Sequence, residues 1–367
     1  MNDLKLTIIT ATFNSEKFLE QTIRSVVSQT YKNIEYIIVD GASKDGTLDI
    51  VKKYETFIHK VISEPDRGIY DAFNKGIDAA TGDVIYFLNS DDYLHNDDVI
   101  WKIMNHFREN ESVEAVYGNI WRFDPETNTG TVYGKPIRLD DFKNGYMPPH
   151  QGLFMRKELF STFGPFELKY KSSSDFDFIL KCFLKMINKA LYVNMLVACF
   201  RIGGASTGYE TRMKGLMETE QIIKERFGVQ VDFSSRETIN NALYREWLES
   251  LLLLDKGITR WLKSRNIRNV AVFGTLKTAH YLYADLTKEG FHIVAFIDNN
   301  EHMHGKEIKG INVHPSSWLS EQDRSIDAVI LSVENSRDGE IMESLRREMP
   351  SRTYVVSWKQ LVSGKLD

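Results

Sequence analysis

The sequence predicts an α/β protein whose sheets are mainly parallel. Short apolar runs alternate with helical patterns at the start of the chain and again near its end, and strands separated by helices need crossover connections that give parallel pairing. A stretch with helical periodicity and no strand lies between these parts. With 367 residues, of which 42% are hydrophobic, the chain is long enough for two domains. We predict an α/β domain at residues 1–212, a helical connector at 213–266 and a small α/β domain at 267–367.

The first domain opens with a clear strand and helix. The strand is the apolar run Leu6–Thr12, and Ser15 provides a hydroxyl of the kind that begins many helices. Ile23, Val26 and Val27 give this helix a buried stripe. The same reasoning predicts strands at Tyr36–Val39, Lys60–Ser63, Val84–Leu88, Ala115–Tyr117 and Ala190–Val193, and helices at Ser15–Ser28, from near Asp45, at Val99–Phe107 and at Asp175–Met186.

The last domain has the order of a Rossmann-like unit. A strand at Asn269–Phe273 ends at Gly274, a helix follows, and Asp298 comes after a second strand, His292–Ile297. Asp298 lies 24 residues beyond Gly274, near the position of a ribose contact, but the other glycines of a dinucleotide motif are missing. We therefore favour assembly or acceptor recruitment over cofactor binding. Two more strands are predicted, at Asp327–Val333 and Thr353–Val356.

Composition excludes several classes of protein. A net charge of −5 and a pI near 6.0 argue against broad nucleic-acid binding. No apolar stretch approaches the roughly 18 residues of a membrane span. Cys182 and Cys199 lie in apolar surroundings without metal-ligand spacing, and we interpret them as reduced core residues. We expect a cytoplasmic protein with no nucleic-acid partner.

The strongest functional pattern is the acidic group Asn89, Ser90, Asp91 and Asp92, which follows the predicted fourth strand. A buried strand that stops at adjacent carboxylates puts two charges at the mouth of a sheet, where a hard divalent cation and a phosphorylated ligand can share them. Acidic residues also cap helices, but residues 96–98 can cap the next helix alone. We expect a nucleotide to bind here.

A second acidic group, residues 40–47, also follows a strand and precedes a helix. Asp40 at the strand end can accept hydrogen bonds from a base or ribose, although a plain turn between strand and helix is the alternative. Between the two groups, residues 64–76 are rich in polar side chains where a helix should begin. Arg67 and Lys75 could meet phosphates there, and a solvated helix face is the alternative for Lys75.

Four segments in this order closely resemble the family 2 glycosyltransferases with the GT-A fold: residues 10–14, 40–47, 68–76 and 89–92. The resemblance covers roughly the first 205 residues. It implies the transfer, with inversion, of a sugar from a nucleotide sugar, commonly a UDP-sugar, to an acceptor hydroxyl. It also implies Mn²⁺ or Mg²⁺ on the donor diphosphate.

The resemblance carries residue roles with it. In that family the acid at the position of Asp40 contacts the nucleobase, and the carboxylates matching Asp91 and Asp92 contact the ribose and the cation. Asn89 replaces the first acid of the common motif, so which of the two aspartates ligates the metal stays open. The residues expected at the nucleotide sugar are Thr10, Asn14, Asp40, Arg67, Asp71, Asn74, Lys75, Asn89, Ser90 and Asp91, and those expected at the metal are Asp91 and Asp92.

Inversion in a single displacement also needs a base that takes the proton of the acceptor hydroxyl. The family often has an acidic pair at a helix start, with its second member as the base. Here Ser174 takes the first place and Asp175 the second, so Asp175 is the predicted base. A helix cap is the alternative role for Asp175, although Ser173 or Ser174 can fill it. Asp177 is the alternative base.

Two further segments are assigned to the acceptor side. His150 and Gln151 resemble an acceptor-side His-Gln element of related transferases, with a structural histidine as the alternative. Residues 200–206 look like the glycine-rich segment that closes the family's catalytic domain, and paired glycines suit a mobile lid. Arg201 in this segment can neutralise the diphosphate, and a surface ion pair is its alternative.

These observations predict a metal-dependent inverting glycosyltransferase acting on a glycan or lipid-linked glycan acceptor in surface polysaccharide or glycoconjugate assembly. The alternatives are a nucleotide-sugar-binding scaffold that has lost catalysis and an NAD-dependent oxidoreductase centred on the last domain. A lipid-linked acceptor would bring the protein to the inner face of the membrane through connector residues such as Lys214 and Lys224. The last domain is also a candidate for homo-oligomer formation.

Overall fold

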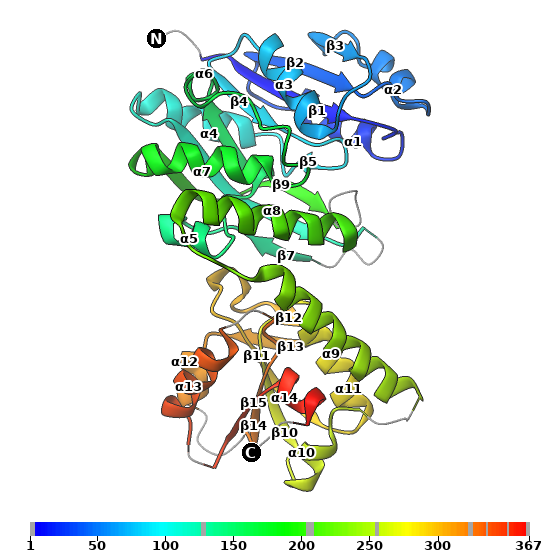
Figure 1. The fold of residues 1–367 in the computed structure, drawn as a ribbon, viewed down its shortest axis with the longest axis vertical. Coiled ribbons are helices and arrows are strands. Elements are labelled where there is room, and N and C mark those ends of the chain that lie inside the picture. Colours follow the sequence, from blue (N-terminus) through cyan, green and yellow to red (C-terminus); the bar gives the residue numbers. More distant parts are fainter. Residues whose placement is uncertain are drawn as a thin grey trace. The chain divides into compact units, whose positions relative to one another are not determined.

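The computed structural model describes residues 4–125, 130–202, 209–253, 257–321, 326–334, 337–350 and 352–364. It contains two compact units, Met1–Asp232 and Phe233–Asp367 (Figure 1). The predicted connector is therefore shared between them, because α8 (Tyr209–Phe227) belongs to the first unit and α9 (Phe233–Leu253) to the second.

The first unit begins with four parallel strands in the order β3-β2-β1-β4. Helices α1, α2 and α3 return the chain between them, so each of these strands ends at the same edge of the sheet. This confirms the predicted α/β fold class. The bounds are β1 (Leu6–Thr12), α1 (Leu19–Val27), β2 (Ile34–Asp40), α2 (Thr47–Lys53), β3 (Lys60–Ser63), α3 (Ile69–Ala79) and β4 (Val84–Phe87).

Beyond β4 the sheet continues with antiparallel pairs. Strand β8 (Leu153–Arg156) pairs antiparallel with both β4 and β6 (Ala115–Phe123), and β6 pairs parallel with β9 (Ala190–Arg201). The sequence indicated only the first residues of β6 and β9, because polar residues such as Asn119 and Asn194 interrupt their apolar runs. The remaining elements are β5 (Tyr93–Leu94), α4 (Val99–Glu109), β7 (Gly130–Tyr133), α5 (Leu139–Lys143), η1 (His150–Gly152), α6 (Glu158–Phe163), α7 (Ser174–Met186) and η2 (Ile187–Lys189).

The predicted first helix starts later than expected. It begins at Leu19 rather than Ser15, because Ser15 forms contacts with other loops: its backbone N–H donates to Thr47 Oγ1 at 2.7 Å, and its hydroxyl lies 2.9 Å from Ser90 Oγ. The predicted buried stripe is present, since Ile23 is fully buried in the core and Val26 nearly so.

The second unit has a sheet whose described strands follow the order β12-β13-β11-β10-β14-β15, and all pairs except β12 with β13 are parallel. Alternate residues of β10 belong to different apolar clusters: Val270 and Val272 to one, Ala271 and Phe273 to the other. Both faces of this sheet are therefore buried. The bounds are α10 (Arg260–Ser264), β10 (Asn269–Phe273), α11 (Lys277–Lys288), β11 (His292–Ile297), η4 (Glu301–Met303), β12 (Glu307–Ile308), β13 (Ile311–His314), α12 (Ser317–Ser320), β14 (Ala328–Leu331), α13 (Asp338–Glu348), β15 (Tyr354–Ser357) and α14 (Trp358–Ser363).

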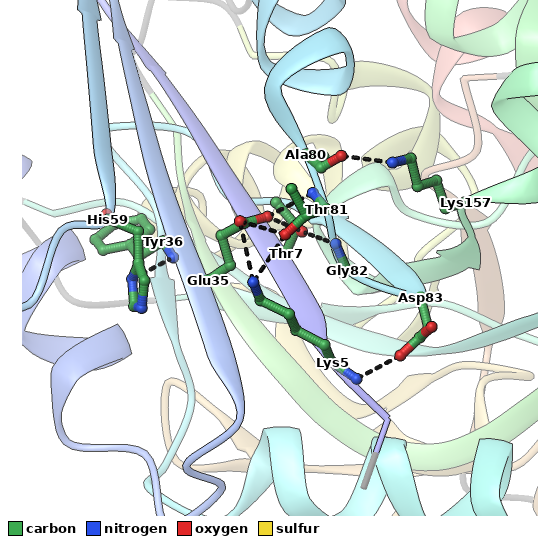
Figure 2. Close-up of polar contacts among 10 residues, drawn as sticks. All are labelled: Lys5, Thr7, Glu35, Tyr36, His59, Ala80, Thr81, Gly82, Asp83 and Lys157. Atoms are coloured by element: carbon green, nitrogen blue, oxygen red, sulfur yellow. Dashed lines mark hydrogen bonds and ion pairs between the residues drawn. The ribbon is translucent and has the colours of Figure 1, made fainter. Parts of the chain in front are cut away.

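A buried carboxylate joins the amino-terminal ends of β1 and β2 to the turn before β4 (Figure 2). Glu35, only 7% exposed, accepts hydrogen bonds from Thr7 Oγ1 at 2.6 Å and from the backbone N–H and hydroxyl of Thr81 at 2.7 and 2.6 Å. The ammonium of Lys5 lies 3.2 Å away. Burial alone would raise the pKa of Glu35, but these donors outweigh it and lower the pKa to about 2.

Replacing Glu35 with glutamine should lower the free energy of unfolding at pH 7 by about 2 kcal/mol, because buried donors lose a charged acceptor. The folded-state pKa lies below the ordinary value of 4.5, so this contribution is present above pH 4.5 and is lost as the pH falls toward 2. Urea unfolding of both proteins at pH 7 and pH 3 measures the difference, which should shrink at pH 3. The exposed Glu109 serves as control in a Glu109→Gln variant, and equal stabilities of Glu35→Gln and wild type at pH 7 would contradict the assignment.

Candidate functional site

Three loops meet at the carboxyl edge of the parallel strands. Asn14, in the loop after β1, adopts a left-handed backbone conformation with φ 49°. Its N–H donates to Ser43 Oγ at 2.8 Å, and its side-chain oxygen accepts the N–H of Lys44 at 2.9 Å. The contact between Ser15 and Ser90 joins the same loop to the one after β4. The predicted residues Asn14 and Ser90 therefore lie in one connected layer of loops.

Asp40 shapes this layer from the end of β2. Its carboxylate is fully buried and accepts hydrogen bonds from the N–H and hydroxyl of Ser43 and, at 2.7 Å, from the hydroxyl of Ser63. Both oxygens are thus engaged by the chain itself. Next to it, a Cβ at Gly41 would lie 2.6 Å from the carboxylate of Asp66, so a side chain there would collide with that acid.

The acidic loop after β4 contains one buried and one half-buried carboxylate. Asp92 is fully buried; its Oδ1 accepts the backbone N–H of Arg201 at 3.2 Å, and its Oδ2 has no hydrogen-bond partner. Burial raises the pKa of Asp92 well above its usual range, and the charge of Asp91 adds to the increase, whereas Arg201 opposes it. Burial also raises the pKa of Asp91. These acids are held in a setting that favours a nearby positive charge.

Arg201 anchors this loop. Its guanidinium donates to the backbone oxygen of Asp91 at 2.7 Å and to the side-chain oxygen of Gln21 on α1. It also lies over the ring of Phe18, 4.4 Å from the centroid, as a cation–π contact. Arg201 is 5% exposed, so the alternative of a surface ion pair is wrong. The predicted lid residues after it, 203–206, lie outside the described residues.

Several buried polar atoms around this edge lack a hydrogen-bond partner within the described residues. They are Thr12 Oγ1, Asn89 Oδ1, Asp92 Oδ2, His150 Nε2 and Ser174 Oγ. Buried polar groups are nearly always paired, so such a concentration marks a place where a ligand or ion supplies the partners. The carboxylate and amide oxygens among them are ligands that Mg²⁺ and Mn²⁺ prefer.

The described residues contain no group of three or more histidine, cysteine or acidic side chains placed to hold a metal ion. Asp91 is the more accessible acid of the loop, because Asp92 has no exposed surface.

His150 and Gln151 lie beside the acidic loop. The ring of His150 packs against the adjacent rings of Phe73 and Phe87, with centroid distances of 5.4 and 5.5 Å. Burial lowers the pKa of His150, and the charge of Asp175 opposes this shift. Gln151 is buried, and its backbone oxygen accepts the hydroxyl of Tyr86 on β4 at 2.7 Å.

Asp175 stands in the first turn of α7 with part of its side chain exposed. Its Oδ1 accepts the hydroxyl of Tyr70 at 2.8 Å and the N–H of Phe176 at 2.9 Å. The alternative base, Asp177, is 1% exposed and forms ion pairs with Arg226 and Lys181, both at 2.8 Å. The ion pairs leave Asp177 with a structural role, whereas Asp175 remains accessible.

The start of α3 carries the remaining predicted residues. Arg67 donates to Asp71 at 2.7 Å, and the Arg67 guanidinium holds the pKa of that carboxyl below its usual value. Lys75 forms an ion pair with Glu64 at 2.9 Å. A shallow surface hollow lies here, lined by Arg67, Gly68, Ile69, Tyr70, Asp71, Leu168, Tyr170 and Lys171.

Asn74 has a structural role in this structure. Its amide nitrogen donates to the backbone oxygen of Phe166 at 3.0 Å, and its amide oxygen accepts the N–H of Phe166 at 2.9 Å. Thr10 is likewise buried, with its hydroxyl 3.2 Å from that of Tyr36. Both side chains stabilise the neighbourhood of the site through contacts within the chain.

Comparisons with known proteins agree with this geometry. Residues 7–165 match the family model described as glycosyl transferase family 2. A PGL/p-HBAD biosynthesis glycosyltransferase of Mycobacterium tuberculosis is 34% identical over 208 residues, which span 54% of this chain and 78% of that protein. The chain belongs to glycosyl transferase family 2. A glycosyltransferase of Nostoc sp. is 28% identical over 264 residues, 66% of this chain and 76% of that protein.

Structural similarity to S. aureus TarS, residues 1–349, solved with UDP-GlcNAc, supports the GT-A fold of this family 2 glycosyltransferase. The TM-score is 0.50 at 18% identity, over 67% of this chain and 73% of that one. Residues 266–353 match a different family model, described as C2185-like, N-terminal.

In the second unit of this glycosyltransferase, the acidic residues Asp298 and Glu334 accept hydrogen bonds from other residues of the same unit. Asp298 accepts the hydroxyl of Thr275 and the N–H of Asn300, so both oxygens are engaged where a ribose contact was expected. Glu334 accepts a hydrogen bond at 2.6 Å from the hydroxyl of Thr278, which lies in the first turn of α11.

Within the described part of the chain, every helix is too short or too polar to cross a membrane.

Sequence reasoning missed two residues of the site. Tyr70 contacts the predicted base, and Glu218 on α8 binds the segment before it. Tyr70 lies inside the segment 68–76, on which the family resemblance partly rests, so the resemblance could have identified it as a site residue. Glu218 had no such signal, because it comes from a mixed-charge helix whose packing the sequence does not specify.

Replacing Arg201 with alanine should lower the free energy of unfolding by about 3 kcal/mol, because the acidic loop loses one hydrogen bond and a compensating charge, and Gln21 on α1 loses a second hydrogen bond. Urea unfolding followed by tryptophan fluorescence measures the change. The exposed Arg24 on α1 provides a control variant, Arg24→Ala, with little effect expected. Wild-type stability of Arg201→Ala would show that the loop does not depend on this contact.

Proposed function

We propose that this family 2 glycosyltransferase moves a sugar from a UDP-sugar to an acceptor hydroxyl with inversion of the anomeric centre. The observation that carries the proposal is that the partly exposed Asp175 faces His150, whose ring packs on Phe87 at the end of β4, directly before an acidic loop with unpartnered buried oxygen atoms. A base and a binding site for a leaving diphosphate are the two groups that such a displacement needs.

Asp175 acts as the base in this proposal. Its Oδ1 is engaged by Tyr70 and by its own helix, which leaves Oδ2 to accept the proton of the acceptor hydroxyl. The hydroxyl oxygen forms a bond to the anomeric carbon while the bond from that carbon to the diphosphate breaks, and the bonding electrons leave with UDP.

The acidic loop holds the donor. We assign Asp91 as the cation ligand, because it is the accessible acid, and Asp92 and Asn89 as the residues that complete the oxygen-rich site. When Mn²⁺ or Mg²⁺ is bound there, it supplies Lewis-acid stabilisation of the charge on the departing diphosphate. TarS, which shares the fold, was solved with UDP-GlcNAc, and this supports UDP-sugars as the first donors to test.

We assign the catalytic role to residues 1–212, a connecting role to 213–266 and an accessory role to 267–367. The match of residues 7–165 to the transferase family and of 266–353 to a separate family supports this division. The acceptor in this proposal is a glycan or lipid-linked glycan, and the enzyme works on the cytoplasmic side.

Calorimetric titration with UDP should show affinity that increases about tenfold or more when Mn²⁺ is present, because Asp91 and Asp92 would hold a cation whose charge stabilises the diphosphate. In a variant with Asp91→Ala and Asp92→Ala the dependence on Mn²⁺ should disappear. Asp98→Ala is the matched control, since Asp98 forms an ion pair with Lys102 outside the loop. A folded wild type with no metal-dependent UDP binding would favour the scaffold that has lost catalysis.

Replacing Asp175 with asparagine should lower turnover by about 10²- to 10⁴-fold, the usual contribution of a general base, while UDP affinity stays unchanged. Asp78→Asn, at an exposed acid of α3, is the control. Product NMR of the wild-type reaction should show the inverted anomeric configuration. Wild-type turnover in Asp175→Asn, or a retained configuration, would refute the mechanism.

A further inference from the structure

Glu218 on α8 binds three successive backbone N–H groups directly before α7. Its Oε1 accepts the N–H of Lys171 at 2.8 Å, and its Oε2 accepts those of Ser172 and Ser173 at 2.8 and 3.0 Å. Asp175 follows two residues later, in the first turn of α7. One carboxylate therefore fixes the backbone that leads into the proposed base.

Glu218 holds the segment before α7 and does not cap the helix itself, because the N–H groups that it accepts precede the first helical residue, Ser174. The N-cap residue Ser173 makes no capping hydrogen bond through its side chain. Its hydroxyl donates instead to the backbone oxygen of Gly215 on α8 at 2.9 Å and lies 3.1 Å from Thr219 Oγ1. The first N–H groups of a helix lack partners inside it, and a negative charge is favourable near them. Glu218 supplies that charge from a neighbouring helix (Figure 1).

A second contact fixes the Asp175 side chain from α3. Tyr70 is 7% exposed, and its ring packs against Phe166 at a centroid distance of 5.7 Å. Burial raises the pKa of the Tyr70 phenol well above its usual value, and Asp175 adds to the increase. Tyr70 is thus a protonated donor to Asp175 Oδ1 at neutral pH. The backbone before Asp175 is held by α8, and its side chain by α3.

We infer that Glu218 is a positioning residue for glycosyl transfer: it fixes the backbone at residues 171–173 so that Asp175 Oδ2 meets the acceptor hydroxyl. Its two carboxylate oxygens are engaged by the chain, so it acts through Asp175 and not on the substrates. The inference rests on the proposed role of Asp175 as the base. A base displaced by about 1 Å can lose about a hundredfold in rate, while donor binding at the acidic loop is unaffected.

The test compares Glu218→Gln with Glu225→Gln, using the full chain. Glu225 is a matched control on the same helix, because it accepts the hydroxyl of Tyr170 at 2.9 Å, whereas the N–H groups of residues 171–173 donate to Glu218. Rates are divided by the number of UDP-binding sites measured by calorimetry, which removes any difference in the folded fraction. For Glu218→Gln we expect kcat to fall about tenfold or more, with the UDP Kd and the donor KM within about twofold of wild type. For Glu225→Gln we expect kcat within about twofold of wild type.

Equal kcat values for Glu218→Gln and Glu225→Gln, with Asp175→Asn inactive, would overturn the positioning role and leave the proposed function intact. Full activity of Asp175→Asn would overturn the proposed function itself. If Glu218→Gln does not fold, Ser173→Ala removes another contact between α8 and the same segment, the one to Gly215. A lowered kcat with unchanged UDP affinity in Ser173→Ala supports the inference, and wild-type kcat overturns it.

Discussion

Parallel pairing of β1 with both β2 and β4 is the constraint on which the site depends. Because all three strands end at one edge, loops that are far apart in the sequence become neighbours, and Asn14 and Ser15 hydrogen-bond to residues of both other loops. The network around Glu35 holds the opposite ends of the same strands together. The acidic loop therefore projects from a part of the sheet that is fixed at both ends.

The acidic loop balances the burial of two carboxylates against the nearby positive charge of Arg201. Two adjacent carboxylates are partly or fully buried, and burial raises the pKa of each. Arg201 compensates for part of this cost through a guanidinium packed on aromatic rings and bonded to the loop backbone. The unpartnered oxygen of Asp92 shows that the compensation is incomplete within the described residues. That shortfall is the physical basis of the cation site that we propose at this loop.

The opposite side of the site depends on helix packing. Asp175 and Asp177 lie two residues apart on α7, yet Arg226 from α8 and Lys181 pair with Asp177, whereas Tyr70 from α3 contacts Asp175. The choice between the two acids is therefore made by neighbouring helices. The same is true of the segment before α7, where Glu218 from α8 accepts the N–H of Ser173, whereas the Ser173 side chain makes no capping bond.

The sequence by itself determined the α/β class, the parallel strands at Leu6–Thr12 and Lys60–Ser63, and the transferase family, because apolar periodicity and strand-end acids are local patterns. The separate role of the last domain stays a prediction. Only the tertiary structure decided that Arg201 is buried beneath the acidic loop, that Asn74 binds the backbone of Phe166, and that Glu218 holds the segment before Asp175. Each of these contacts joins residues between 45 and 110 positions apart, and no local pattern encodes such a pairing.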